Sequence, residues 1–174
     1  MINIDIKSTN EFDFALTASK DQIEKAALRA LNKTSRWLRS DLVSQTAKSL
    51  NIKSTPIRDV LVIVRAKKTN LKTTVGLSKR GGVIRAIDAG SATQNSKGVR
   101  VGKRQFDNAF LATMPSGHHG VFKRKGKERL PIKEVQIFIS SKLHDLMEEA
   151  SHGRALSHFE TVFERELRYL RKAG

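Results

Sequence analysis

A long amphipathic helix between residues 19 and 50 is the strongest constraint on the fold. Ser19 and Gln22 form the S-x-x-Q pattern of a capping box, whose two side chains satisfy free amides of the first turn. Apolar residues then recur at helical spacing from Ile23 to Leu42. The helix is expected to end near Leu50, with Asn51 in the left-handed capping conformation. At 1.5 Å per residue it would be about 45 Å long, so it can also serve as an assembly surface.

Short runs rich in β-branched and alternating apolar residues predict antiparallel strands. Residues 2–6 alternate apolar and polar side chains and predict one strand. Residues 60–78 predict a hairpin that reverses at Thr69-Asn70, preceded by a single helical turn at Thr55-Pro56. Residues 109–114 and 121–124 predict a second hairpin, and 135–138 is expected to add a third strand beside it.

The remaining segments complete an α+β prediction. Residues 143–150 and 156–170 show helical spacing, with a bend or break at His152-Gly153. Glycines and small polar residues between 79 and 97 predict an extended loop or arm, which could become ordered against a neighbouring subunit. We therefore expect one domain over 1–174, in which the N-terminal and C-terminal helices pack on a mostly antiparallel sheet. A long loop is expected around 79–108.

The net charge of +16 favours partners that are polyanions or acidic protein surfaces. The chain has no cysteine, which excludes disulfides, thiolate metal sites and cysteine nucleophiles. The longest strongly apolar run, residues 60–64, is far shorter than the roughly 20 residues that span a membrane. Nothing at the N-terminus resembles a signal peptide. No membrane partner is expected.

Two basic clusters are the candidate surface for DNA or an acidic partner. They flank strands that are expected to be neighbours, so their charges should converge at one edge of the sheet. The candidates are Lys103, Arg104, Lys123, Arg124, Lys125, Lys127 and Arg129. A secondary basic face lies on the long helix, roughly opposite its apolar stripe. Its residues form either a solvated face or a rail against a polyanion, and they are Lys25, Arg29, Lys33 and Arg36.

Patterns for metal binding and catalysis fail on spacing. His118 and His119 are adjacent on a turn without a nearby carboxylate, and the other histidines lack the one-turn spacing of a helical zinc site. Gly98-x-x-x-Gly102-Lys103 does not have the spacing of a phosphate-binding loop. No nucleophile elbow or pair of catalytic carboxylates is present. We therefore expect no catalytic residue, no metal, no cofactor and no enzymatic activity. Aromatic residues are also scarce, which argues against base-stacking recognition of single strands.

Four runs of residues, taken in order, carry a resemblance to a known protein family. The earliest is Ala30-Leu-Asn-Lys-Thr-Ser-Arg-Trp-Leu38. The next two are Gly98-Val-Arg-Val-Gly-Lys-Arg-x-Phe106 and Ala109-Phe-Leu-Ala-Thr-Met-Pro115-x-Gly117-His118-x-Gly120-Val-Phe-x-Arg-Lys-Gly126. The last is Arg129-Leu-Pro-Ile-x-Glu-Val135. In order and spacing these runs resemble the phage minor tail protein Z family, and the resemblance extends from about residue 23 to residue 135.

The resemblance implies a structural virion protein that completes the tail so that it joins the DNA-filled head. Proteins of this kind are α+β folds that form rings, commonly six-fold, at the head–tail junction. The implied partners are further copies of the chain, tail-terminator, tail-tube or head-closure proteins, and packaged double-stranded DNA. The implied location is the virion tail or neck, with the host cytoplasm during assembly. The alternative is a basic nucleic-acid-binding protein that associates with the nucleoid or the ribosome.

Overall fold

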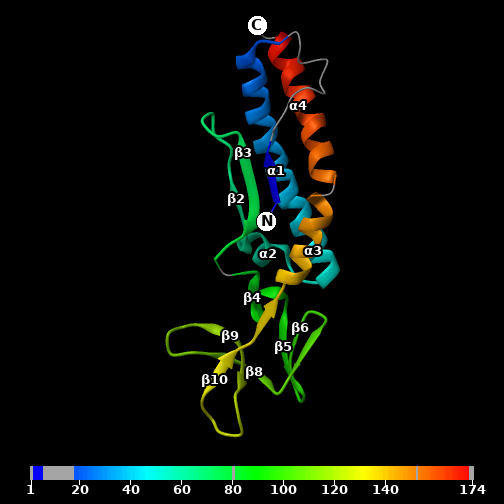
Figure 1. Ribbon diagram of the computed structural model, residues 1–174. Coiled ribbons are helices and arrows are strands. Elements are labelled where there is room, and N and C mark those ends of the chain that lie inside the picture. Colours follow the sequence, from blue (N-terminus) through cyan, green and yellow to red (C-terminus); the bar gives the residue numbers. More distant parts are fainter. Residues whose placement is uncertain (1, 6–17, 80, 152, 173–174) are drawn as a thin grey trace. The chain divides into compact units, whose positions relative to one another are not determined.

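The chain is a mixed α+β protein that divides into two compact units. The computed structural model describes residues 2–5, 18–79, 81–151 and 153–172 (Figure 1). We name residues 1–42, 61–77 and 144–174 the helical unit, and residues 43–60 and 78–143 the sheet unit. The predicted α+β class is confirmed. The unit boundaries fall inside helices α1 (Lys20–Leu50) and α3 (Ser140–Ser151), so the single domain stays a prediction.

The helical unit combines a three-stranded antiparallel sheet with the long helices. The strands are β1 (Ile2–Asp5), β2 (Leu61–Val64) and β3 (Lys72–Leu77), in the order β1-β3-β2. The predicted hairpin is confirmed, with Ile63 opposite Val75. Helix α4 (Arg154–Lys172) follows α3, so the predicted break near Gly153 is also confirmed. Of the strand predicted over residues 2–6, the last residue lies outside the described residues.

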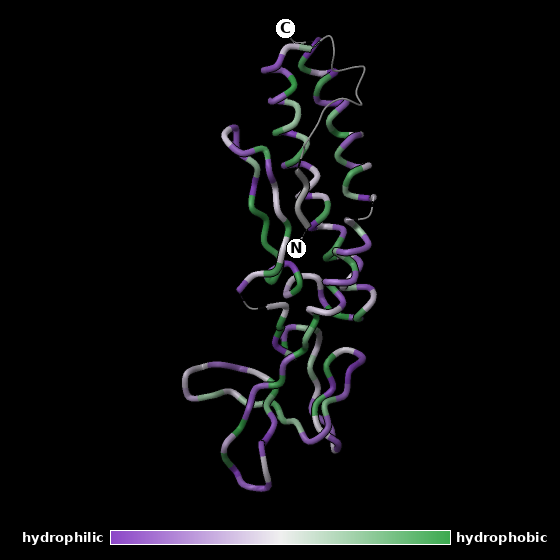
Figure 2. Tube along the Cα trace, in the orientation of Figure 1, coloured by the Kyte–Doolittle hydropathy of each residue, from purple (hydrophilic) through white to green (hydrophobic). Residues whose placement is uncertain are grey.

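Helices α1 and α4 run side by side and share one apolar core (Figure 1). Hydrophobic and hydrophilic residues alternate along both helices (Figure 2), because each turn presents one face to the other helix. Burying each large side chain stabilises the unit by about 1.5–3 kcal/mol relative to exposure. The buried residues of this core are Ala26, Ala27, Ala30, Leu31, Ala66, Phe159, Val162, Phe163 and Leu167.

A buried carboxylate adds an electrostatic contact between the same helices. Glu166 on α4 is only 7% exposed and pairs with Lys33 and Arg29 of α1; its distance to the Arg29 guanidinium is 3.6 Å. Burial raises the pKa of the Glu166 carboxyl. The hydrogen bond from Lys33 and the charges of Lys33, Arg29 and Arg165 outweigh that effect and hold the pKa below its ordinary value of 4.5. The carboxylate is therefore charged in the folded protein at neutral pH.

One aromatic stack lies next to this ion cluster and provides a spectroscopic probe. Trp37, the single tryptophan of the chain, stacks on His158 of α4 with ring centroids 4.1 Å apart and planes 10° apart. The His158 Nδ1 also lies 3.2 Å from the hydroxyl of Thr34. Burial, followed by the charge of Arg165, lowers the pKa of His158. The environment of Trp37 therefore reports on whether α1 and α4 are packed together.

Helix α1 ends at Leu50, and its C-terminal cap has the conformation that the sequence predicts. Asn51 has a φ of 54°, and the Ile52 N–H donates to the carbonyl of Ala47 at 3.2 Å, the six-to-one bond of a Schellman cap. At the other end, the predicted capping box is confirmed. The Ser19 N–H donates to the Gln22 side chain at 3.0 Å, and the Gln22 N–H donates to the Ser19 hydroxyl at 3.3 Å.

The sheet unit contains short elements only. Helix α2 (Ser54–Val60) and the 3-10 helix η2 (Ala86–Ala89) accompany three small antiparallel sheets, ordered β5-β6-β7, β10-β9-β8 and β11-β4. The strands are β4 (Val83–Arg85), β5 (Ala92–Asn95), β6 (Gly98–Val101), β7 (Arg104–Asp107), β8 (Ala109–Thr113), β9 (His119–Arg124), β10 (Ile132–Glu134) and β11 (Gln136–Phe138).

The long loop predicted around 79–108 is wrong. Residues 83–107 contain β4, η2, β5, β6 and β7, and the last three strands form a meander. The segment 92–95 is mostly exposed and has no apolar alternation that would predict a strand. Pairing with β6 decides its structure, because strand formation depends on neighbours more than on intrinsic preference. Gly98 is the first residue of β6, and Gly102 is the first residue of the turn that follows it.

The predicted third strand at 135–138 also pairs differently. Residues of β11 pair with β4, whereas β10 is the strand beside β9. Val135 lies between β10 and β11, where the chain passes from one sheet to the next. Its N–H donates to the Val121 carbonyl at 2.8 Å, and its carbonyl accepts from the Ala86 N–H at 2.9 Å. One residue therefore satisfies both sheets, which periodicity in the sequence cannot reveal.

We expect Glu166→Gln to lower the free energy of unfolding at pH 7 by about 1–2 kcal/mol, because the substitution removes a charge-assisted hydrogen bond between two packed helices. Because the folded pKa is depressed, this stabilisation is present above pH 4.5 and disappears as the pH falls through the folded pKa. The difference from the wild type should therefore shrink in acid. Urea unfolding followed by Trp37 fluorescence measures it.

The matched control is Glu164→Gln on the same helix. Glu164 lies 3.8 Å from Arg168 in an exposed pair, and such pairs contribute about 0–1 kcal/mol. An equal decrease of stability in both variants, or a difference for Glu166→Gln that does not change with pH, would contradict this account.

Candidate functional site

A positively charged groove lies in the sheet unit between the β5–β6 turn and the β9–β10 loop. Its volume is about 520 Å³. Figure 2 shows the β9–β10 loop as mainly hydrophilic. We name this hollow the basic groove, and its lining residues are Gln94, Asn95, Ser96, Lys97, Gly98, Asn108, Ala109, Phe110, Lys123, Arg124, Lys125, Gly126 and Lys127. The lining contains five cationic side chains and no carboxylate.

The Gln94 side chain joins the two sheets that enclose the groove. Its amide nitrogen donates to the carbonyl of Ala109 at 3.3 Å, and its amide oxygen accepts from the Leu111 N–H at 2.8 Å. An adjacent antiparallel strand would bond the same two backbone groups of β8. The amide also donates to the carbonyl of Gly98 at 3.0 Å. One side chain therefore satisfies the edge of β8 and fixes it against β5 and β6.

The β5–β6 turn is held by a second amide. The Asn95 side-chain oxygen accepts from the backbone N–H groups of Lys97 and Gly98 at 3.0 and 2.9 Å. Gly98 has a φ of 149°, and a Cβ there would lie 3.0 Å from the Asn108 nitrogen and closer still to the Phe106 carbonyl. Only glycine fits this close approach of backbones. Lys97 is thereby presented at the rim of the groove.

The opposite wall carries an arginine whose position is fixed by an aromatic ring. The Arg124 guanidinium lies over the Phe110 ring, 5.9 Å from its centroid, a favourable cation–π arrangement. Phe110 itself packs against Phe122, its partner across the β8–β9 ladder. The exposed charge of Arg124 is therefore oriented by the sheet beneath it.

The structure brings together some of the predicted basic residues and separates others. Lys123, Arg124, Lys125 and Lys127 line the basic groove, but Arg129 does not. Strand β6 begins at Gly98 in the groove, and Lys103 and Arg104 follow its other end. The length of the strand places them roughly 13 Å from Gly98. The expected convergence of the two clusters is therefore wrong. The reason is that β6 runs away from the groove, so the turn after it carries Lys103 and Arg104 at the far end. Strand β7 then returns toward the groove, where Asp107 pairs with Gly98.

The Arg104 side chain makes a structural contact at the end of α1. Its guanidinium donates to the carbonyl of Leu50 at 3.1 Å, one of the backbone carbonyls that the last turn of α1 leaves without a helical partner. A cation at this position also interacts favourably with the helix dipole. Lys103 beside it is exposed.

The predicted secondary basic face is largely engaged within the helical unit. Lys25 pairs with Asp21 at 2.5 Å, while Arg29 and Lys33 pair with Glu166. Arg36 donates to the backbone carbonyl of Asn32 at 3.1 Å. Three of the four cations therefore pair with two carboxylates, Asp21 and Glu166, which balances about half of the positive charge of this face.

Lys97, Gln94 and Gly98 were not among the predicted site residues. The long loop expected around residues 79–108 hid all of them, since a turn lysine has no visible partner without the strands that flank it. A signal existed only for Gly98, as one of several glycines in a basic segment. Nothing in the sequence indicates that the Gln94 amide replaces a strand.

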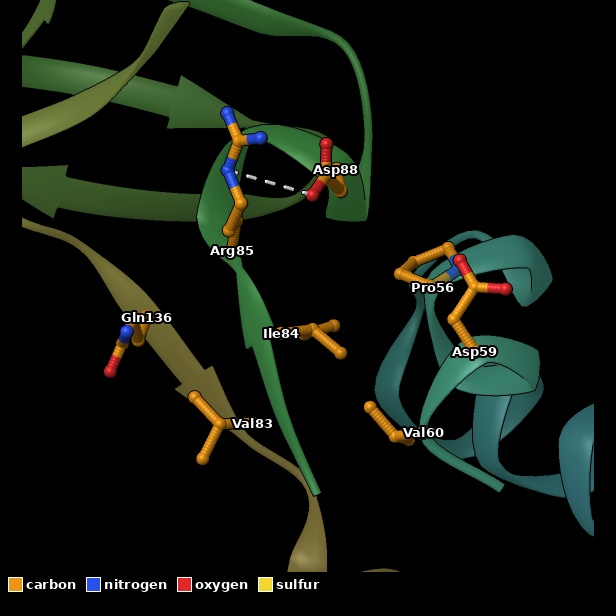
Figure 3. Close-up of a pocket in the computed structure, with 8 residues that line it drawn as sticks. All are labelled: Pro56, Asp59, Val60, Val83, Ile84, Arg85, Asp88 and Gln136. Atoms are coloured by element: carbon orange, nitrogen blue, oxygen red, sulfur yellow. Dashed lines mark ion pairs between the residues drawn. The ribbon is translucent and has the colours of Figure 1, made fainter. Parts of the chain in front are cut away.

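A second hollow, of about 550 Å³, lies between α2 and β4 (Figure 3). Ile84 points toward Val60 across it, and Asp59 and Asp88 provide carboxylates at its rim. Arg85 is held by Glu134 at 2.8 Å and by Asp88 at 3.7 Å. The hollow therefore contains mixed, partly paired charges over an apolar floor and has no nucleophile–base pair.

The described residues contain neither a cluster of possible metal ligands nor a helix that could cross a membrane. Within the described residues, no three histidine, cysteine or carboxylate side chains are grouped as metal ligands would be. His118 contacts Glu134 at 3.1 Å and His119 contacts Thr113 at 3.0 Å, so the adjacent histidines have separate partners. Across the same ranges, no helix is both long enough and apolar enough to cross a membrane.

The comparison with protein families identifies a structural component of a phage tail. The family model for prophage minor tail protein Z matches residues 16–172 of the 174. The chain therefore belongs to the prophage minor tail protein Z family, as the motifs at 30–38 and 98–135 predicted. Neither a curated protein nor a solved structure matches it.

We expect Gly98→Ala to lower the free energy of unfolding by more than about 2 kcal/mol, because a Cβ at this φ meets the backbone of β7. The matched control is Gly126→Ala, which lies in the same groove with nothing within 4 Å of the added Cβ. Differential scanning calorimetry of both variants measures the effect. Equal melting temperatures for the two variants would contradict the close approach at Gly98.

Proposed function

We propose that the chain completes the phage tail as a homo-oligomeric ring, in a six-fold arrangement, at the head–tail junction. The observation that carries this proposal is the family match over residues 16–172. The ring would contact tail-terminator or tail-tube proteins on one side and head-closure proteins on the other. In this proposal the chain is assembled in the host cytoplasm and remains in the virion neck, where it acts without catalysis.

Apolar side chains exposed at a sheet edge support self-association. β2 is an edge strand of its sheet, and Val62 and Val64 on it are 42% and 62% exposed. An apolar edge strand is a surface that proteins usually cover. A neighbouring subunit would cover it, and this contact takes the place of the 79–97 arm expected from the sequence.

The alternative is a free nucleic-acid-binding protein of the nucleoid or the ribosome. The basic groove is the observation that favours it, because its composition suits a polyanion. Location separates the two functions: a tail-completion protein is a component of purified virions, whereas a nucleoid or ribosomal factor is absent from them.

Deletion of the chain tests the role in tail completion. We expect a prophage without it to release heads and tails that fail to join, because the junction lacks its ring. Electron microscopy of the lysate and plaque counts measure this, and a plasmid copy of the chain should restore infectivity. Normal infectious particles in the absence of the chain would contradict the proposal.

Replacement of the exposed valines tests the ring contact. We expect the pure wild-type chain to have six times the 19.5 kDa mass of one chain in light scattering. The double variant Val62→Lys, Val64→Lys should be smaller, because charges at the edge oppose strand pairing. Thr161→Lys, an exposed position on α4, is the matched control. A monomeric wild type, or a double variant of unchanged mass, would contradict this contact.

A further inference from the structure

The basic groove concentrates positive charge that no described carboxylate balances. Lys97, Lys123, Arg124, Lys125 and Lys127 line it, and none of them forms an ion pair within the described ranges. By contrast, Lys33 and Arg29 of the helical unit are paired with Glu166. Five cations in one lining without a carboxylate make the groove a site of concentrated positive charge.

The acidic residues that are nearest in the sequence also lie outside the groove lining. Asp107 and Glu128 are close in sequence to the groove residues, yet neither lines the groove. The cations come from two separate segments that the Gln94 amide holds against each other. The positive charges thus line a common hollow, where a bound anion would relieve their mutual repulsion.

The composition of the lining favours a phosphodiester backbone over an acidic protein surface. Protein–protein contacts are depleted of charge at their centre and rely on apolar or aromatic anchors. In the groove, Ala109 is buried and the Phe110 ring is covered by Arg124, so no anchor pocket is open. Interfaces with nucleic acid are, in contrast, polar and strongly positive.

The same lining lacks the groups that read base identity in single strands. Base stacking requires exposed aromatic faces, and the Phe110 ring face is occupied by the Arg124 guanidinium. The amides of Gln94 and Asn95 are engaged by backbone groups of the fold. What remains available is charge, which contacts phosphates and carries no sequence information.

We propose that the basic groove binds the phosphate backbone of duplex DNA without regard to base sequence, through Lys97, Arg124 and the lysines at 123, 125 and 127. The phosphate chemistry follows from the groove itself. The choice of DNA as the polyanion rests on the proposed function, because the proposed junction surrounds the passage of packaged DNA.

Salt-dependent binding by the full-length chain tests this proposal. The probe is a fluorescent 20-base-pair DNA duplex of arbitrary sequence (about two helical turns, at roughly 10 base pairs per turn), titrated by anisotropy at several salt concentrations. In the triple variant Lys97→Gln, Lys125→Gln, Lys127→Gln, we expect affinity at low salt to fall at least tenfold. The slope of log K against log salt should become shallower by about 0.9 for each phosphate that the variant no longer neutralises.

A matched triple variant controls for net charge. Lys48, Lys53 and Lys103 are exposed lysines of the sheet unit outside the groove, and their replacement by glutamine removes the same charge. This variant should keep the wild-type affinity within about threefold, and both triple variants should keep the wild-type melting temperature. A second duplex of unrelated sequence should bind equally well.

Three outcomes would overturn the proposal. The first is an equal decrease of affinity in both triple variants, and the second is an unchanged affinity in the groove variant. The third is competition by a polyglutamate peptide as strong as that by DNA of equal charge, which would assign the groove to an acidic protein. A separate experiment distinguishes this proposal from the proposed function: the infectivity of phage that carry the groove variant. If the variant loses DNA binding but heads and tails still join normally, the proposed function stands and joining does not require the groove.

Discussion

The side-chain amide of Gln94 is the contact on which the candidate site depends. It bonds both edge groups of β8 and the first residue of β6, and so replaces the strand that would otherwise lie between the two sheets. Unpaired backbone groups at this edge would be costly to bury. Because the amide satisfies them, the sheets stay apart at the surface, and the hollow between them is lined by the turns that carry Lys97 and the 123–127 cations.

The distribution of charge gives the two units different properties. In the helical unit, Glu166 pairs with both Lys33 and Arg29 and thereby turns part of the basic surface into a contact between helices. In the sheet unit, Arg104 donates a hydrogen bond to a backbone carbonyl at the end of α1, whereas the groove cations have no described carboxylate partner. A net charge of +16 is therefore not spread evenly. It is partly matched between α1 and α4, whereas the basic groove gathers five cations in one lining without a carboxylate.

The sequence predicted the elements that local chemistry determines and missed those that depend on distant partners. The capping box at Ser19, the left-handed Asn51 and the hairpin of β2 and β3 follow from patterns within a few residues. The meander of β5, β6 and β7 does not, because Thr93, Gln94 and Asn95 form a strand only through pairing with β6. The same limit applies to the site: the 123–127 cluster was visible as charge, but its separation from Arg104 depends on the direction of β6.

The family match and the structure together describe a tail component with an exposed apolar edge strand and an open basic groove. The most direct test of that picture is a symmetry-resolved cryo-electron microscopy reconstruction of the head–tail junction of the phage that carries this chain. The account predicts a ring of copies of this chain at the junction, with Lys97 and the 123–127 loop facing the DNA in the lumen. A junction without this chain, or a ring whose basic groove faces away from DNA, would contradict it.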